Sequence, residues 1–279
     1  MWESEEAKRS LIKAARSTDA AARASRDKAM RMLQAMAQRA ENRVPMWKDD
    51  TGVRAVLISV AKLTDPGDRA ARVSAVSTLW NLAGEPANKK SMWLDLRVRT
   101  ALTEAATLSS PEDAKVKAAA VAVLCCMSAE DANREAMWRD EGARTAVVQA
   151  SLSTDPSNAQ LRERALAVLL DLSSKRENAE SIWEDVHGAR AAVVSAASQS
   201  EPCSNRARLY ALAALQSLTD QEENRPSMWA DCQGARACLV QGALLCNIDD
   251  AEARACALAA LWGLSCSPSS RGPMWQDQH

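Results

Sequence analysis

The sequence predicts an all-α fold, an α-solenoid of about six similar helical repeats. The first observation is a tryptophan that recurs every 45 or 46 residues, preceded by Met in every case but one, where Ile182 precedes Trp183. A fixed period of this length is typical of stacked repeat proteins. The second observation is the composition, which lacks Phe and contains one Tyr, nine Gly and nine Pro. The chain is also rich in Ala, the best helix former, and so few Gly and Pro leave little to interrupt helices. The series consists of Trp2, Trp47, Trp93, Trp138, Trp183, Trp229 and Trp275.

The period predicts one continuous array over residues 1–279. Its units are residues 1–45, 46–91, 92–136, 137–181, 182–227 and 228–273, followed by a partial unit at 274–279. Residues 42–87 show the plan of a unit. A short first helix over 44–49 follows Asn42, because Asn is a typical N-cap residue. Gly52 permits a sharp change of direction, and a second helix follows over 53–63. The Asp-Pro-Gly-Asp segment at 65–68 forms a turn, and a third helix over 69–83 buries an apolar stripe at helical spacing.

Two features of this plan recur in the other units. The opening asparagine returns five residues before each Trp, and the glycine returns two residues before an arginine. The asparagines are Asn88, Asn133, Asn178 and Asn224, and the glycines are Gly142, Gly188 and Gly234.

Three segments carry a resemblance to a known family: Gly52-Val-Arg-Ala-Val-Leu, Leu79-Trp-Asn-Leu-Ala, and the asparagine at position 88. With three helices per unit and a Gly between the first and second, the plan resembles the armadillo repeat over nearly the whole chain. HEAT repeats are the close alternative, and the Gly with its short first helix favours armadillo. The units exceed the usual armadillo length of about 42 residues by one helical turn, still within the range of helical repeats. The resemblance implies a right-handed solenoid whose third helices line a concave groove.

The recurring tryptophan is expected in the core, between neighbouring units, because a Trp side chain buries a large apolar area. From Trp47 onward an aspartate follows two places later, and each unit carries two recurring basic positions. Buried or half-buried ions need a partner, so we hypothesise a repeated Asp–Arg ion pair between neighbouring helices, and either row of basic residues fits. The aspartates are Asp49, Asp95, Asp140, Asp185, Asp231 and Asp277. The first row is Arg9, Arg54, Arg99, Arg144, Arg190 and Arg236, and the second row is Arg26, Arg72, Lys117, Arg162, Arg208 and Arg254.

The resemblance places recognition on the exposed side of the third helices, where residues differ from unit to unit. The candidate contacts are Arg31, Ser77, Asn81, Arg164, Asp171 and Tyr210, with Trp80 and Trp262 beside them as packing or binding residues. Asn81 matches the family's peptide-clamping asparagine. No Trp lies one turn before it, so the Asn/Trp ladder of nuclear-import receptors is missing. A continuous basic groove like that of adhesion-junction members is missing too.

The predicted function is a non-catalytic scaffold or adaptor that binds a protein partner, as a peptide or helical segment, in this groove. One alternative is nucleic-acid binding through the two arginine rows, which the formal net charge of −1 disfavours. A purely structural spacer is another. No enzyme, metal or cofactor is expected, because the two histidines, His187 and His279, lie outside any Cys/His cluster and no phosphate loop or nucleophile motif occurs.

The eight cysteines show no disulfide-framework spacing, which favours a reducing compartment, the cytoplasm or the nucleus. No apolar stretch of the length that spans a membrane occurs. The last unit keeps an apolar third helix near the end of the sequence. Since solenoids need polar caps, end-to-end association through this repeat, or a longer array, is expected.

Overall fold

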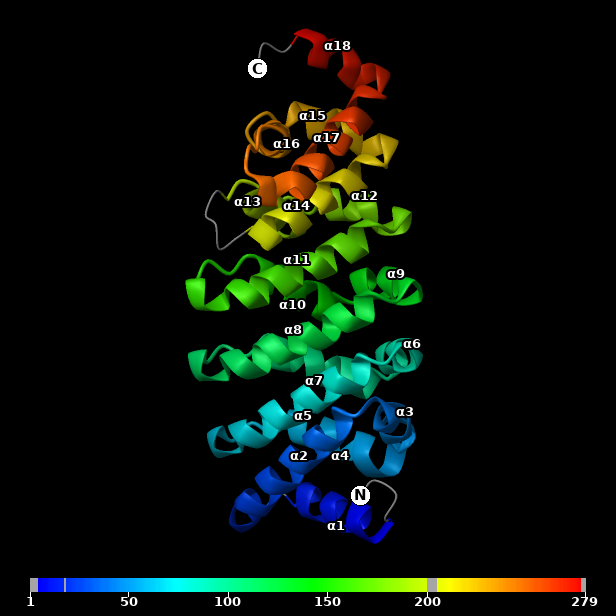
Figure 1. Ribbon diagram of the computed structural model, residues 1–279, viewed down its shortest axis with the longest axis vertical. Coiled ribbons are helices and arrows are strands. Elements are labelled where there is room, and N and C mark those ends of the chain that lie inside the picture. Colours follow the sequence, from blue (N-terminus) through cyan, green and yellow to red (C-terminus); the bar gives the residue numbers. More distant parts are fainter. Residues whose placement is uncertain (1–4, 18, 200–204, 277–279) are drawn as a thin grey trace. The chain divides into compact units, whose positions relative to one another are not determined.

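The protein consists of helices throughout residues 5–17, 19–199 and 205–276, the parts of the chain that the computed structural model describes. The predicted all-α fold is therefore confirmed. The chain divides into two compact parts, each made of several repeats. We call them unit 1 (Met1–Asn133) and unit 2 (Arg134–His279). Figure 1 shows the helices of each unit stacked in layers, in the order of the sequence.

Three kinds of helix alternate along both units: first helices, second helices, and third helices of 15 residues each. The first helices are α3 (Ala40–Lys48), α6 (Pro86–Leu94), α9 (Asp131–Arg139), α12 (Arg176–Glu184), α15 (Arg225–Ala230) and α18 (Pro268–Gln276). The second helices are α1 (Glu5–Arg16), α4 (Ala55–Ala61), α7 (Leu96–Ala106), α10 (Glu141–Ser151), α13 (Ala189–Ala197) and α16 (Ala235–Ala243). The third helices are α2 (Arg23–Ala37), α5 (Arg69–Ala83), α8 (Ala114–Ser128), α11 (Ala159–Ser173), α14 (Asn205–Thr219) and α17 (Ala251–Ser265).

The third helices form the centre of each unit. In unit 1, α5 packs against both α2 and α8, and in unit 2, α14 packs against both α11 and α17. The predicted third helix over 69–83 coincides with α5, and its predicted apolar stripe is fully buried at Ala75, Val76, Leu79 and Leu82. A 3-10 turn, Pro66–Asp68, precedes α5 where the sequence predicts a turn, and Asp65 accepts a hydrogen bond from the backbone N–H of Gly67 at 2.7 Å.

The first helix begins earlier than predicted, whereas the second begins at Ala55, two residues later than predicted. The first helix, α3, runs from Ala40 to Lys48 instead of 44–49, and a π-helical turn, Asp50–Arg54, leads into α4. The assignment of Asn42 as N-cap is wrong, because the cap position belongs to Arg39 and the Asn42 amide donates to the carbonyl of Met36 at 2.9 Å. The asparagine thus donates to a carbonyl at the end of the preceding third helix, whereas an N-cap asparagine would use its side-chain oxygen to accept a backbone N–H of the following helix.

Glycine recurs at this position for a different reason from the predicted one. None of the described glycines has a positive φ, so a left-handed turn is not what selects Gly. The aspartate before it, such as Asp185 before Gly188, folds its carboxylate back over the glycine to accept a hydrogen bond from the backbone N–H of Ala189 at 2.8 Å. A Cβ atom at Gly188 would overlap this carboxylate. Glycine is required because it leaves space for the capping carboxylate.

Candidate functional site

The seam, meaning the recurring Trp, Asn, Asp and Arg positions that join successive repeats within a unit, begins with the tryptophans. The indole N–H of Trp47 donates to the hydroxyl of Ser91 at 2.7 Å, and that of Trp183 donates to Ser227 at 2.7 Å. Both rings are 3% exposed. Trp138 bonds Ser181 in the same way at 2.6 Å. The predicted core position is confirmed for Trp47, Trp93, Trp138, Trp183 and Trp229.

The prediction is wrong for Trp275, which is 91% exposed, because no helix in the described part of the chain follows α18 to cover it. Trp2 lies outside the described residues. A tryptophan of this series is therefore buried only where the next first helix packs over it.

The first row of arginines stacks on the tryptophans. The guanidinium of Arg54 lies 4.7 Å from the centre of the Trp47 ring, and that of Arg190 lies 3.9 Å from Trp183. Such cation–π contacts are favourable, the more so when the cation is shielded from water. Arg99, Arg144 and Arg236 lie in the same way over Trp93, Trp138 and Trp229.

The same row makes the hypothesised ion pair with the aspartate of the next repeat. Arg190 lies 2.9 Å from Asp231, and Arg54 lies 3.7 Å from Asp95. The hypothesis of Asp–Arg pairing is therefore confirmed at these two sites, and the first row supplies the arginine. In the first repeat, Lys8 takes the place expected for Arg9 and lies 3.3 Å from Asp49.

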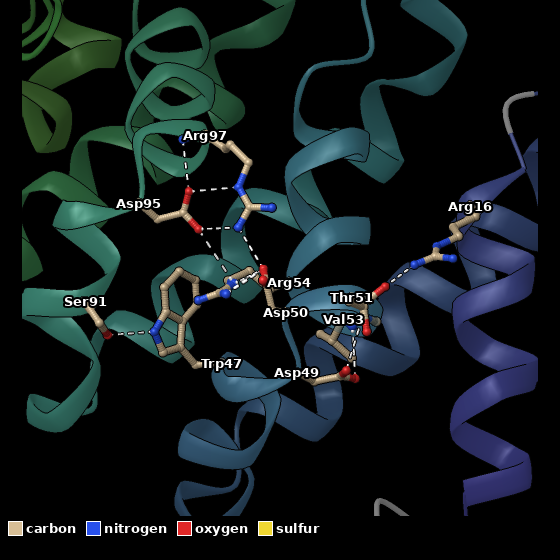
Figure 2. Close-up of polar contacts among 11 residues, drawn as sticks. Arg16, Trp47, Asp49, Asp50, Thr51, Val53, Arg54, Ser91, Asp95 and Arg97 are labelled. Carbon is tan, nitrogen blue, oxygen red and sulfur yellow. Dashed lines mark hydrogen bonds and ion pairs between the residues drawn. The ribbon is translucent and has the colours of Figure 1, made fainter.

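Around Trp47 several ion pairs share partners and form a cluster (Figure 2). Arg97 reaches both Asp95 and Asp50 at 2.7 Å, and Asp50 also pairs with Arg54. The hydrogen bonds from Arg97 lower the pKa of Asp50 and of Asp95 below their ordinary values. In Figure 2 these side chains converge beside the indole of Trp47, whose N–H points away from them toward Ser91.

Four arginines of the second row are buried: Arg26, Arg72, Arg162 and Arg208. Arg72 donates to the carbonyl of Leu63 at 2.9 Å and to the carboxylate of Asp113 at 2.7 Å. Arg208 does the same with Gln199 and Asp250, at 2.9 and 2.5 Å. Burial alone would raise the pKa of Asp113, but the hydrogen bonds from Arg72 and Arg69 lower it below its ordinary value. These guanidinium groups are committed to internal partners.

The asparagines form a ladder that the sequence alone did not reveal. Asn178 is 1% exposed, and its amide donates to the carbonyl of Leu172 and to that of Arg134, both at 3.1 Å. The first acceptor ends the third helix of its own repeat and the second lies in the first helix of the preceding repeat. Asn88, Asn133 and Asn224 repeat the pattern. The strict spacing of five residues before each Trp was the available signal.

In unit 1 the predicted contacts lie on α2 and α5, and we call this set of residues the unit 1 face (Arg31, Ser77, Trp80 and Asn81). Arg31 is exposed, Ser77 and Asn81 are half-buried, and Trp80 is 39% exposed. The amide of Asn81 reaches the carbonyl of Gln34 on α2 at 3.5 Å, the limit of a hydrogen bond. Three of the four residues lie on one helix, α5, and Arg31 lies on its neighbour α2.

In unit 2 they lie on α11, α14 and α17, which we call the unit 2 face (Arg164, Asp171, Tyr210 and Trp262). The first three are half-buried, and Trp262 is 72% exposed. Asp171 lies 3.8 Å from Arg134, a pairing that the sequence did not predict. The hydroxyl of Tyr210 accepts a hydrogen bond from Arg206 at 3.0 Å, and Arg206 lies 3.3 Å from Glu163. Sequence reasoning missed Arg206 and Glu163.

The described residues offer little for metal or covalent chemistry. Within residues 5–17, 19–199 and 205–276, no group of three or more His, Cys, Asp or Glu could hold a metal ion. The seven described cysteines are free thiols. Burial raises the pKa of the Cys238 thiol, which disfavours the reactive thiolate. The described helices are all too short or too polar to cross a membrane.

The helix order and the seam define an armadillo-type repeat fold, and solved structures agree. A computationally designed armadillo repeat protein for modular peptide recognition superimposes with a TM-score of 0.72 at 15% identity, over 91% of this chain and 98% of that chain. A designed armadillo repeat protein in complex with the peptide (KR)4 gives 0.71 at 16% identity, over 94% and 100%. A structure solved for the interaction between cadherin and beta-catenin gives 0.67 at 14% identity, over 91% of this chain and 44% of that chain. Neither the protein-family models nor the curated protein sequences gave a match.

Proposed function

We propose that the protein is a non-catalytic scaffold that binds a peptide or helical segment of a protein partner in a groove lined by the exposed sides of its third helices. The observation that carries the proposal is that tryptophans of the seam are buried, whereas a tryptophan on a third helix is exposed. Trp183 in the seam is 3% exposed and hydrogen-bonded, whereas Trp262 on the unit 2 face is 72% exposed. Exposed tryptophans on a rigid helical surface are the kind of residue at which binding energy concentrates.

The neighbouring residues supply specificity. On the unit 1 face, Arg31 and Ser77 add polar groups beside Trp80, and on the unit 2 face Tyr210 and Arg164 do so. The structural neighbours support a peptide ligand, since one was designed for peptide recognition and another holds the peptide (KR)4. The same arrangement of third helices in this chain offers a surface of that kind.

The arrangement does not favour nucleic-acid binding through the arginine rows. Arg72 and Arg208 are 3% and 5% exposed and bind carboxylates, and Arg190 is paired with Asp231. Phosphate binding would have to break these internal pairs. The free thiols support a reducing compartment, so we place the scaffold in the cytoplasm or the nucleus.

A displayed random-peptide library tests the proposal. Peptides selected on the intact chain are measured by fluorescence anisotropy against Trp80→Ala and Trp262→Ala. We expect at least one of these variants to lose about tenfold or more in affinity, because truncation of a binding tryptophan costs 2 kcal/mol or more. The matched controls are Leu94→Ala and Val186→Ala, which remove apolar side chains that are 66% and 50% exposed but lie outside the third helices.

The controls should bind like the parent chain. Selected peptides that tolerate both tryptophan variants and lose affinity only with Leu94→Ala or Val186→Ala would exclude the third-helix faces. Failure to select any peptide would count against the proposal as well.

A further inference from the structure

The first helices of unit 2 are not anchored equally well. Helix α12 is held by three side-chain hydrogen bonds. Asn178 donates to the carbonyl of Arg134 in α9 and to that of Leu172 in α11, both at 3.1 Å, and Trp138 in α9 donates to Ser181 at 2.6 Å. Helix α15 repeats all three with Asn224, Trp183 and Ser227. These bonds join each first helix to the one before it and to its own third helix.

Helix α18 occupies the same place over α15 and α17 with most of these bonds missing. Ser270 stands where the asparagine is expected, and its hydroxyl reaches only the carbonyl of Arg225, at 3.4 Å. Pro273 stands where the serine is expected, so its ring offers no acceptor to the tryptophan below. Arg271 keeps the start of the helix attached, donating to the carbonyl of Ser265 at 3.1 Å.

The consequence is a buried and unsatisfied donor. The side chain of Trp229 is 7% exposed, and its indole nitrogen is buried without a hydrogen-bond partner. An unsatisfied buried donor costs about 1–3 kcal/mol. Pro273 also lies inside α18, where it removes a backbone hydrogen bond. Both defects arise at Pro273, in the part of α18 that follows its Arg271 anchor.

We propose that the surface of α15 and α17 around Trp229 is a helix-binding site that α18 fills poorly, and that a better-matched helix of a partner protein displaces α18. The partner helix carries an asparagine and, three residues later, a serine followed by an apolar residue and tryptophan. The asparagine bonds the two carbonyls that Ser270 leaves without an amide donor, and the serine accepts the N–H of Trp229. This site is built around Trp229, which belongs to neither the unit 1 face nor the unit 2 face, so the proposal does not rest on the proposed function.

The first experiment repairs α18 within the intact chain. Pro273→Ser restores both the backbone N–H and the missing acceptor, whereas Pro273→Ala restores the backbone alone and is the matched control. We expect the amides of α18 to exchange about three- to tenfold more slowly in Pro273→Ser than in Pro273→Ala, measured by hydrogen exchange, because one hydrogen bond is gained. Equal exchange in the two variants would overturn the proposal.

The second experiment supplies the partner helix. A fluorescein-labelled peptide with the sequence of residues 175–186, which contains the Asn and Ser of α12, is titrated with the intact chain and followed by anisotropy. Saturable binding of this peptide is expected. A peptide in which both residues are Ala should bind about tenfold or more weakly. The parent peptide should also bind more weakly to a chain carrying Ser270→Asn with Pro273→Ser, because the repaired α18 competes with it.

Two results overturn the proposal: no binding of the parent peptide, or equal binding of both peptides to both chains. Neither result bears on the third-helix faces, since Trp80→Ala and Trp262→Ala leave this site intact.

Discussion

The seam and the third-helix faces use the same residue types in opposite ways. In the seam, Trp183 donates to Ser227, Arg190 pairs with Asp231, and Asn178 bonds two carbonyls. On the faces, Trp262 is mostly exposed and the amide of Asn81 makes only one contact, at 3.5 Å. A residue that recurs in every repeat is held by its hydrogen bonds and ion pairs within the protein. A residue that varies between repeats makes fewer such bonds. The residues available for the proposed binding are therefore those at which the repeat pattern varies.

The largest expected effect comes from the two tryptophans. Trp183→Ala should lower the free energy of unfolding by about 3–5 kcal/mol, because it opens a cavity in the seam. Trp262→Ala should change it by less than about 0.5 kcal/mol, because the side chain is already exposed. Urea unfolding followed by circular dichroism measures both. Comparable losses of unfolding free energy in the two variants would contradict the proposed difference between seam and face tryptophans.

The same substitution, Asn→Ala, can be made in the seam and on the unit 1 face, and the two effects on stability can be compared. Asn178→Ala removes two buried side-chain hydrogen bonds, so we expect a loss of about 1–3 kcal/mol. Asn81→Ala on the unit 1 face should cost less than about 0.5 kcal/mol. Thermal unfolding of both variants gives the ranking, and a neutral Asn178→Ala would show that the ladder is dispensable.

The two glycines should give effects of opposite sign. Gly188→Ala places a Cβ against the capping carboxylate of Asp185, and we expect a loss of about 1–2 kcal/mol. Gly272→Ala in α18 meets no atom within 4 Å, and Ala should stabilise the helix by up to about 1 kcal/mol. Differential scanning calorimetry distinguishes the two signs. Stabilisation by Gly188→Ala would mean that the carboxylate does not occupy this space.

The smallest expected effect concerns the ion cluster of Asp50, Asp95 and Arg97. The folded-state pKa values of both carboxyls lie below their ordinary values. Their stabilisation is therefore fully present above about pH 4, the unfolded value, and is lost as the pH falls through the folded values. Arg97→Gln should lower the melting temperature by about 1–2 °C at pH 7.

That difference should shrink as the pH falls below about 4, because protonation of the carboxyls removes their pairing with Arg97. Melting curves of the parent and Arg97→Gln at neutral and at acidic pH test the sign. A difference that grows on acidification would contradict the assignment of Arg97 as the group that lowers these pKa values.

The repeat, the third helices and the burial of five of the recurring tryptophans could be predicted from the sequence, because period, helical spacing and apolar content are local properties of the chain. The bounds of α5 and the burial of Leu79 and Leu82 followed from them. Only the tertiary structure decided which arginine row meets Asp95 and Asp231, since both rows recur with the same period. Only it showed that Asn178 bonds two carbonyls from different helices and that glycine makes room for a carboxylate, because these contacts join atoms that the sequence spacing cannot place. The exposure of Trp262, and the unsatisfied N–H of Trp229, are likewise properties of packing.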